Sequence, residues 1–507
     1  MDNLRLAAID IGTNSIRSIV VEAQPDGSFR ILDDEKATVR LGNGLNETGM
    51  ISEEASQRAL ETFARFCKIY SGYGVTQVEA IATSAVRKAK NGADFIKEVE
   101  RKTGLKIAVI SGEEEAELAA LSALNNFDLD GNRHLLTDLG GGSLELVTTV
   151  GRQIDHVVSL DLGAVYLTET FLSGDPVKAG ALKKLRRHIR ETLRLAFPDE
   201  RPAIHSVIGS GGTLTAIAAM IAASRGESYT SLHGYELQHA DVVHLLVQLS
   251  RCTLQERRNI PGLNADRADI IVAGVAVVDG LLEFCRGNLL RINERGIREG
   301  LILRALQKNG CGMATRKRRT WKDSVMAFAA SCRYDAAHSL HVATLADQIF
   351  SAVAEPFGLG KRDRQLLEAA AILHDIGYFI NYSSHHKHSC HLIRHGELFG
   401  FTPRERELIA QTARYHRKSL PKPEHAEYRR LSREDRLLVA RLGGILRLAD
   451  GLDRQRRALV TGLDLSLEKS RMMVALRGRE DLSVETYAAQ AKSRLFEKAF
   501  GLRFVLQ

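Results

Sequence analysis

The chain has 507 residues, of which 44% are hydrophobic and 26% charged, a balance that excludes disorder as its main state and predicts roughly three or four domains. Aromatic residues make up only 6%, with a single tryptophan, which argues against a stacking platform for single-stranded nucleic acid. The net charge of +8 is uneven, because residues 311–507 hold 34 Lys and Arg against 22 Asp and Glu while residues 1–310 hold 36 against 40, so we expect the basic part to face a polyanion.

Strands and helices alternate over the first 310 residues, which favours α/β architecture. Two apolar runs within Leu4–Val21 flank the polar stretch DIGTNSIR and predict a strand, a loop and a strand. We then expect, in chain order, a helix over 52–70 capped by Ser52, a strand at 77–82, a helix over 85–103, a strand at 106–110 and a helix over 113–123. The opening pattern returns from 134 in HLLTDLGGGSLELVTTV, which indicates an internal duplication.

The character of the chain changes beyond about residue 310. The basic stretch RKRRT at 316–320 predicts a linker. Helical patterns follow at 339–355, 362–373, 404–415 and 433–449, and the last stretch predicts a small strand–helix–strand cap. The N-terminal stretch is not typical of a signal peptide and no apolar run reaches the ~20 residues of a membrane span, so we expect a cytoplasmic protein. The six cysteines form no CxxC motif, and we expect free, buried thiols.

Glycine-rich loops follow three of the predicted strands. In DIGTNS (10–15) and DLGGGS (138–143) a strand delivers an aspartate, and glycine then lets the backbone turn with its N–H groups exposed. Such N–H groups and hydroxyls can hold phosphate oxygens, and an aspartate can hold Mg²⁺. One such loop would be read as an ordinary turn, but two related loops favour a phosphate site. The predicted phosphate-binding residues are Asp10, Gly12, Thr13, Asn14, Ser15, Gly140, Gly141, Gly142 and Ser143, joined by Gly211, Gly212 and Thr213 of a third loop.

Seven motifs taken together resemble the exopolyphosphatase/guanosine pentaphosphate phosphohydrolase (Ppx/GppA) family. In chain order they are DIGTNSIR, ATSAVRKAKN, ISGEEEAEL, DLGGGSLEL, SLDLGAVYLTETF, GSGGT and IREG. The resemblance implies two ribonuclease-H-like domains of the sugar kinase/actin/Hsp70 fold group, over 1–130 and 131–310. An all-α HD-like domain over 311–460 and a small α+β cap over 461–507 would follow.

The resemblance also assigns roles to individual residues. Glu115 would be the general base that activates the attacking water, with its neighbour Glu114 as the nearest alternative. Asp138 and Asp10 would hold the divalent metal, and Arg87 would clamp phosphate through its guanidinium fork. The residue-level alternative for Glu113–Glu115 is a solvated first helical turn favoured by the helix dipole. Mg²⁺ is the implied cofactor, with K⁺ as a candidate second ion, and the resemblance implies a homodimer.

Histidines cluster in the C-terminal part. The order His341, His374-Asp375, Asp450 resembles the HD superfamily of metal-dependent phosphohydrolases, and these four residues would surround one additional divalent ion. His388 and His416 are weaker candidates for extending the site to a second metal. The alternative is an HD-like domain that binds no metal and serves as a scaffold for the polymer.

The predicted function is Mg²⁺-dependent, processive removal of terminal phosphate from inorganic polyphosphate. Hydrolysis of the 5′ γ-phosphate of guanosine pentaphosphate (pppGpp) is the alternative within the same family. A non-catalytic polyphosphate or nucleotide sensor and a kinase of the same fold group are alternatives from other classes. Nucleic acid is not expected as the polyanion, because the loops address phosphates and no stacking aromatics accompany them.

Overall fold

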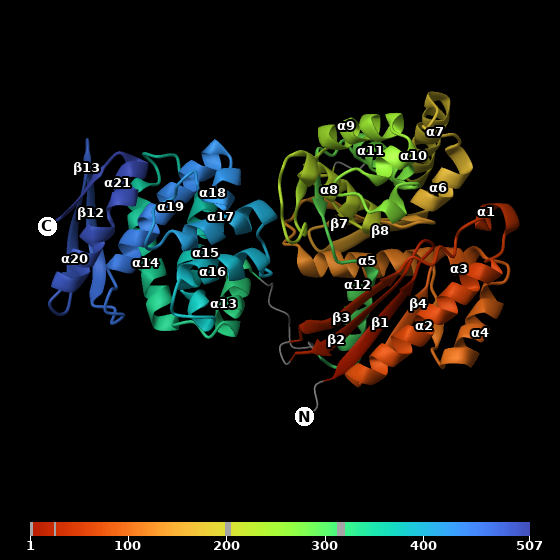
Figure 1. Ribbon diagram of the computed structural model, residues 1–507, viewed down its shortest axis with the longest axis horizontal. Coiled ribbons are helices and arrows are strands. Elements are labelled where there is room, and N and C mark those ends of the chain that lie inside the picture. The colour runs from red at the N-terminus through yellow and green to blue at the C-terminus, as the bar shows by residue number, and fades with distance from the viewer. Residues whose placement is uncertain (1–3, 25–26, 198–203, 312–319) are drawn as a thin grey trace. The chain divides into compact units, whose positions relative to one another are not determined.

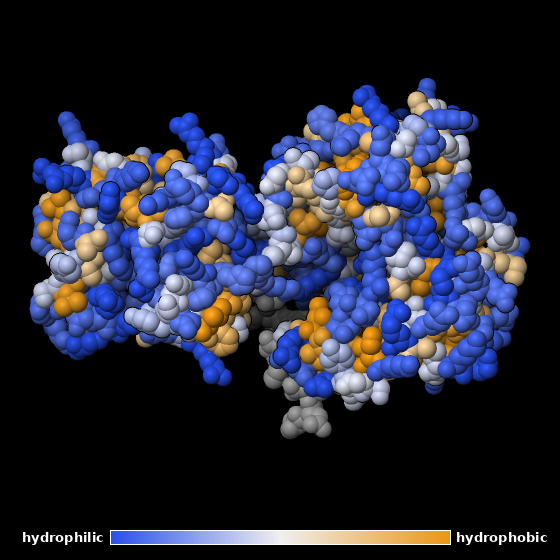
Figure 2. Space-filling view, viewed as in Figure 1, coloured by the Kyte–Doolittle hydropathy of each residue, from blue (hydrophilic) through white to orange (hydrophobic). Residues whose placement is uncertain are grey.

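The computed structural model describes residues 4–24, 27–197, 204–311 and 320–507, which belong to two compact units, residues 1–318 and 319–507 (Figure 1). The predicted linker residues 316–319 lie outside the described residues. None of the described helices is both long and apolar enough to cross a membrane. Hydrophilic side chains cover most of the visible face of each unit (Figure 2).

The first sheet of unit 1 has the strand order β3-β2-β1-β4-β5. Its strands are β1 (Arg5–Ile11), β2 (Ile16–Ala23), β3 (Phe29–Ala37), β4 (Gln77–Ala82) and β5 (Ile107–Val109). The helices along this part of the chain are α1 (Leu45–Thr48), α2 (Glu53–Tyr73), α3 (Ser84–Lys88), α4 (Gly92–Thr103) and α5 (Gly112–Asn126). Alternate side chains of β1 face opposite sides of the sheet: Ala7 and Ile9 pack in the core with α2 and α4, and Leu6 and Ala8 in the core with α12 (Ile297–Lys308).

The second sheet of unit 1 has the order β10-β11-β9-β6-β7-β8. Its strands are β6 (Arg133–Leu139), β7 (Leu144–Val150), β8 (Gln153–Leu160), β9 (Ser206–Ser210), β10 (Glu236–Gln238) and β11 (Leu289–Ile292). The remaining helices of unit 1 are α6 (Ala164–Phe171), α7 (Ala179–Ala196), α8 (Gly212–Ser224), α9 (His239–Arg251), α10 (Leu254–Arg258), the short 3₁₀ helix η1 (Ala265–Arg267) and α11 (Ile271–Phe284).

Two helices lie between the sheets of unit 1 (Figure 1). Helix α5 packs the small side chains of Ala116, Ala120 and Ala123 against one face of the second sheet. Helix α12 packs against the first sheet and meets α5 at Leu118. Helix α12, near the C-terminal end of unit 1, thus covers the first sheet, which the N-terminal residues of the unit form.

The internal duplication predicted from the sequence is visible as two matching hairpins. Strand β1 pairs antiparallel with β2 and parallel with β4, and β6 pairs antiparallel with β7 and parallel with β9. The turns match too, since Gly12 donates its N–H to the Ser15 carbonyl and Gly140 donates to the Ser143 carbonyl, both at 3.1 Å.

Unit 2 is a helical region with a three-stranded sheet in the order β12-β13-β14. The helices are α13 (Trp321–Ser331), α14 (Ala336–Val353), α15 (Lys361–Leu373), the 3₁₀ helix η2 (Ile376–Phe379), α16 (His385–His395), α17 (Pro403–Arg414), α18 (Ala426–Arg430), α19 (Arg433–Gly451), α20 (Ser483–Lys492) and α21 (Arg494–Phe500). The strands are β12 (Val460–Glu468), β13 (Arg471–Gly478) and β14 (Arg503–Leu506).

The C-terminal sheet and the helices of unit 2 share one hydrophobic core. Met472 and Phe504 of the sheet belong to the same cluster of buried side chains as Leu345 and Leu442 of the helices. Strand β12 was not predicted, and the single helix expected in the cap is divided into α20 and α21.

Candidate functional site

A cleft of about 760 Å³ lies in unit 1, where β1, β6 and β9 end in their glycine-rich loops. The two hairpins place their aspartates at equivalent positions: Asp10 lies opposite Arg17 in the β1–β2 pair, and Asp138 opposite Glu145 in the β6–β7 pair. The predicted residues that line the cleft are Asp10, Gly12, Thr13, Asn14, Ser15, Asp138, Gly140, Gly141, Gly211, Gly212 and Thr213.

The third loop brings the start of helix α8 to the cleft. Gly211 has a φ of 105°, a conformation that side-chain-bearing residues rarely adopt. A Cβ atom there would lie 2.6 Å from the Leu139 carbonyl oxygen and 2.8 Å from an Asp138 carboxylate oxygen. Glycine is therefore required for α8 to begin directly beside Asp138, with its free N–H groups available for an anion.

Buried carboxylates lie in the cleft, at Asp10 and Asp138, and next to it, at Glu145. Burial raises the pKa of Asp10 to about 6, and burial together with the Asp10 charge raises the pKa of Asp138 to about 7. Glu145 is 2% exposed, and its burial and the Asp138 charge raise its pKa to about 8. Crowded carboxylates of this kind are stabilised by a divalent cation, so the donor set fits Mg²⁺.

Three arginines, Arg17, Arg267 and Arg298, also line the cleft. Arg298 forms an ion pair with Asp34 at 2.6 Å. The guanidinium groups of Arg17 and Arg267 have no ion-pair partner among the described residues. Burial lowers the pKa of Arg267 to about 10, and the Arg17 charge contributes. Nearby carboxylates, among them Asp10 and Asp138 for Arg17 and Asp266 and Asp269 for Arg267, act on these two groups without forming ion pairs with them. Two adjacent guanidinium groups with unpaired N–H donors make a site for a strongly charged anion such as phosphate.

Glu115 and Glu114 lie in different surroundings, although both are in the first turn of α5. Burial and the charges of Glu145 and Asp10 raise the pKa of Glu115 well above its usual value. Its carboxylate forms an ion pair with Arg87 at 3.3 Å. Glu114 instead pairs with Arg304 of α12 at 2.6 Å. Only Glu115 belongs to the electrostatic cluster of the cleft.

Three predicted phosphate-binding residues do not line the cleft. Gly142 packs behind the loop, where a Cβ atom would lie 2.5 Å from the Ser84 hydroxyl and 2.6 Å from the Thr13 hydroxyl. Ser143 is buried and hydrogen-bonded to Glu145. Arg87 donates to the Ile110 carbonyl at 2.7 Å as well as to Glu115, so in this structure it holds the carboxylate of Glu115.

Two family models match this chain. The Ppx/GppA phosphatase family model matches residues 20–309, and the model of Ppx/GppA phosphatase domain III matches residues 321–488. This chain belongs to the Ppx/GppA phosphatase family. It is therefore a phosphoanhydride hydrolase, as its sequence motifs predicted.

Curated relatives and solved structures of the Ppx/GppA family match about 60% of the chain. "Exopolyphosphatase 1" of Mycobacterium tuberculosis is 31% identical over 319 residues, 61% of this chain and 91% of that protein, and its Mycobacterium leprae counterpart is also 31% identical. The crystal structure of an exopolyphosphatase from Cytophaga hutchinsonii has a TM-score of 0.57 at 29% identity, covering 60% of this chain and 98% of that one. The Aquifex aeolicus family member has a TM-score of 0.53 at 28% identity, covering 60% and 98%.

The sequence motifs did not single out four of the charged residues that shape this Ppx/GppA cleft. Arg17 ends the motif DIGTNSIR and Glu145 lies within DLGGGSLEL, so the motifs themselves contain both residues and could have identified them. Arg298 belongs to the motif IREG and lines the cleft. Arg267 comes from η1, and no local sequence signal connects it with the phosphate loops.

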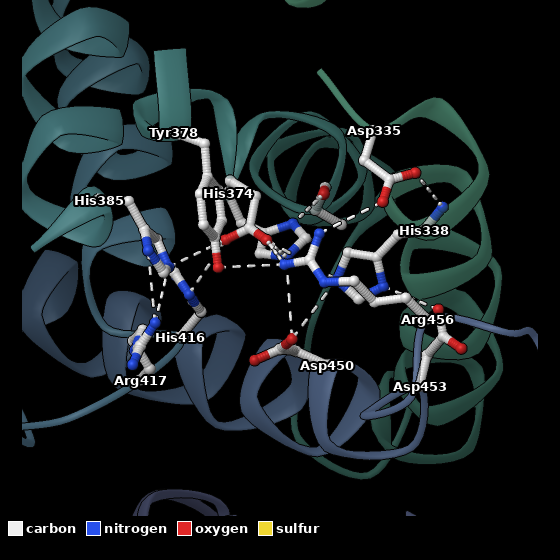
Figure 3. A network of polar contacts seen from close by, with 12 residues as sticks. Asp335, His338, His374, Tyr378, His385, His416, Arg417, Asp450, Asp453 and Arg456 are labelled. Atoms are coloured by element: carbon white, nitrogen blue, oxygen red, sulfur yellow. Dashed lines mark hydrogen bonds and ion pairs between the residues drawn. The ribbon is translucent and has the colours of Figure 1, made fainter. Parts of the chain in front are cut away.

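Domain III contains the histidine cluster, but with a different membership (Figure 3). His374, Asp375, His416 and Asp450 come together as predicted residues, and His338 and His385 join them. The prediction of His341 was wrong: it lies one turn further along α14, beside Val460, and His338 occupies the site. His388 likewise lies one turn beyond His385 on α16 and is partly exposed.

Proposed function

We propose that the chain hydrolyses the terminal phosphate of inorganic polyphosphate in the cleft of unit 1. The observation that carries this proposal is that two buried guanidinium groups, those of Arg17 and Arg267, line one cleft together with the buried carboxylates Asp10 and Asp138 and three glycine-rich loops. A phosphoanhydride end group needs cations and N–H donors around its oxygens and a carboxylate beside the attacking water.

The side chains have distinct tasks in the proposed reaction. Arg17, Arg267 and the loop N–H groups bind the terminal phosphoryl oxygens. Glu115 accepts a proton from water as the water oxygen attacks the terminal phosphorus and the bridging oxygen departs with the shortened chain. Its raised pKa makes the carboxylate a stronger base than an ordinary glutamate. Asp10 and Asp138 would hold Mg²⁺, which supplies positive charge to the transferring group.

Polyphosphate is favoured over pppGpp by the lining of the cleft. Among the described residues, no aromatic side chain lines it or the adjoining pocket at Arg40 and Asn43, so no stacking surface is offered to guanine. The similar mycobacterial proteins are named exopolyphosphatase. The residues that line the cleft offer several hydrogen-bond donors to phosphate oxygens. A polymer of phosphates presents such oxygens along its whole length.

A competition between substrates tests this choice. We expect kcat/KM for long-chain polyphosphate to exceed that for pppGpp by about tenfold or more, a difference of about 1.4 kcal/mol in transition-state binding. Both would be measured with one preparation by phosphate release at equal Mg²⁺ concentration. A preference for pppGpp of the same size would contradict the proposal and identify the nucleotide as the substrate.

A further inference from the structure

A short segment of unit 1 joins its two sheets and has no task in the proposed function. It comprises residues 38–46, which follow β3 and reach the first residues of α1, and we call it the strap. Helix α1 lies beside α6 (Figure 1), and α6 packs in the core of the second sheet through Leu167. The strap therefore starts on the first sheet and ends against a helix that belongs to the second.

The far end of the strap is fixed to α6 through one carboxylate. The Gly44 N–H donates to Glu169 Oε1 at 3.2 Å, and the side-chain amide of Asn46 donates to Glu169 Oε2 at 2.8 Å. Each oxygen of this carboxylate thus accepts a hydrogen bond from the strap.

The middle of the strap lies against the first phosphate loop, residues 10–15. The Arg40 N–H donates to the Asn14 carbonyl and the Gly42 N–H to the Thr13 carbonyl, both at 2.9 Å. A Cβ atom on Gly42 would lie 2.2 Å from Thr13 Cγ2, so the two backbones approach to a distance that only glycine allows. The strap and the phosphate loop therefore keep a fixed position relative to each other.

The side chain of Arg40 reaches from the strap to η1, the short helix that carries Arg267. Its Nη1 donates to Asp269 Oδ2 at 2.8 Å, and its Nη2 donates to the Asp266 carbonyl at 3.0 Å. The Thr38 hydroxyl adds a hydrogen bond to the Asp266 carboxylate at 3.4 Å. Asp266 and Asp269 lie on either side of Arg267 in the chain, so one guanidinium holds the backbone segment from which Arg267 projects.

The backbone of Arg40 has an uncommon conformation. Its φ of 59° lies in the left-handed region, which residues with a side chain rarely adopt. Such a conformation persists where the surrounding contacts fix it. Here the N–H of the residue is bonded to the phosphate loop and its side chain to η1, as expected of a link between the two.

Arg267 needs such a link because a second cation lies beside it. A Cβ atom on Gly212 would lie 2.0 Å from Arg267 Nη2 and 3.0 Å from Arg17 Nη2. Burial, and then the charge of Arg17, lower the pKa of Arg267 to about 10, so the two guanidinium groups repel each other. They can bind one phosphate together only if contacts outside the pair hold them in place.

A competing interpretation is that η1 needs no link to the first sheet. The buried guanidinium of Arg257 donates to the Ala268 carbonyl at 3.0 Å, and the Asn264 side chain caps η1 by accepting from the Asp266 N–H at 2.9 Å. Both contacts, however, hold η1 to residues that follow the second glycine-rich loop, and neither reaches residues 10–15. Arg40 makes that connection.

The link is also weak enough to be removed without unfolding the chain. The side chains of Arg40 and Asp269 are 39% and 33% exposed, and exposed ion pairs contribute little to stability. A substitution at Arg40 should therefore leave the fold intact while Arg267 loses its connection with the phosphate loop.

We propose that Arg40 is a positioning residue of the cleft, which fixes η1 against the first phosphate loop and so holds the Arg267 guanidinium where it binds the terminal phosphate. Arg40 lines the adjoining pocket and not the cleft, so it acts on the phosphate through Arg267. A lysine cannot replace it, because one ammonium group does not reproduce the rigid fork that addresses Asp269 and the Asp266 carbonyl together. This inference rests on the function proposed for the cleft.

A double-mutant cycle tests whether Arg40 acts through Arg267. KM and kcat for long-chain polyphosphate are measured by phosphate release in the original chain, Arg40→Ala, Arg267→Ala and the double variant. We expect Arg40→Ala to raise KM about threefold or more, with kcat within about twofold of its original value. In the Arg267→Ala background the same substitution should change KM by less than about 1.5-fold.

Two further variants separate position from charge and from general damage. Arg40→Lys keeps the charge without the fork, and it should recover less than half of the increase in KM, on a logarithmic scale. Arg30 of the same strand pairs with Glu22 at 2.8 Å, and Arg30→Ala is the matched control that should leave KM within about 1.5-fold. Thermal unfolding verifies that each variant is folded.

Three results would overturn the inference and leave the proposed function standing. They are a smaller rise in KM in Arg40→Ala or a loss of kcat in its place, a further rise of more than about 1.5-fold in the Arg267→Ala background, and recovery of more than half of the increase by Arg40→Lys. An unchanged KM in Arg267→Ala itself would contradict the proposed function, and this inference with it, so the two failures are distinguishable.

Discussion

At the scale of one residue, Arg267 is the clearest candidate for binding phosphate in the cleft under the proposed function. Arg267 is 8% exposed, and its guanidinium lies beside Gly212 at the N-terminus of α8, close to that of Arg17 and without an ion-pair partner among the described residues. Arg267→Ala should raise KM for polyphosphate by about ten- to hundredfold, because a charge-assisted hydrogen bond contributes about 1.5–3 kcal/mol. Steady-state phosphate release measures KM.

A matched arginine outside the cleft serves as the control. Arg291 pairs with Glu236 on the neighbouring strand at 3.1 Å, and an exposed pair of this kind contributes little. Arg291→Ala should leave KM within about twofold of its original value. Equal effects of the two substitutions would contradict the role given to Arg267.

The carboxylates of the cleft predict how metal binding depends on pH. The pKa of Asp10 is raised to about 6 and that of Asp138 to about 7, against about 3.9 for an ordinary aspartate. Raised values mean that protons compete with Mg²⁺ near neutral pH, so affinity is full above about pH 8 and falls as pH drops. From about pH 8 to about pH 6 the Kd for Mg²⁺ should rise about tenfold or more, measured by calorimetry.

An unchanged Kd over this interval would contradict the shared, buried environment of these two acids. Asp138→Asn provides the control, because it removes the group that titrates at the higher pH. In that variant the remaining metal affinity should be weaker at every pH and should change less between about pH 8 and about pH 6.

Single residues were predicted from the sequence where a motif fixed them and missed where tertiary packing decided. The motif ISGEEEAEL selected Glu115 over Glu114. By contrast, His341 was chosen in place of His338, and His388 in place of His385, each an error of three residues along one helix. Residues three apart lie on nearly the same helical face, so spacing cannot tell them apart. The axial position of each helix relative to its neighbours decides which of the two histidines reaches the cluster. Contacts with residues far away in the sequence set that position.

At the scale of elements, the strand–loop–strand hairpins were predictable because an aspartate and glycines interrupt two apolar runs. Helix α2 was also predictable, because Ser52 is a typical N-cap residue, and it accepts a hydrogen bond from the Ala55 N–H. Strand β12 was missed although Leu463, Leu465 and Leu467 alternate with polar residues, a pattern typical of a half-buried strand. The packing of α12 on the first sheet could not be predicted, because no local pattern states which sheet a helix will cover.

The loop before α8 gives a prediction at this scale. Gly211→Ala would place a Cβ atom 2.6 Å from the Leu139 carbonyl oxygen at a φ of 105°, so we expect a loss of about 2–4 kcal/mol in stability. Thermal or denaturant unfolding measures the change. Gly180→Ala in α7 is the control, because a Cβ atom there meets nothing within 4 Å, and it should alter stability by less than about 1 kcal/mol. Equal effects of the two substitutions would contradict the geometry of this loop.

At the scale of the whole molecule, the uneven charge predicts different tasks for the two units. Residues 311–507 hold 34 Lys and Arg against 22 Asp and Glu, and polyanion affinity grows with the number of phosphates neutralised. A chain of residues 1–311 should lose about tenfold or more in kcat/KM for polymers of about 100 phosphates, but change less than about twofold for tripolyphosphate. Equal losses for both substrates would contradict this division.

In the proposed reaction Glu115 is the base, and the phosphate is bound by other residues of the cleft. The decisive measurement compares turnover and polyphosphate binding in Glu115→Gln, with Glu114→Gln as the matched neighbour. We predict that Glu115→Gln lowers kcat by about 10²–10⁴-fold with an unchanged Kd for polyphosphate, and that Glu114→Gln keeps most of the activity. Turnover that persists in Glu115→Gln, or falls as far in Glu114→Gln, would contradict the proposed mechanism.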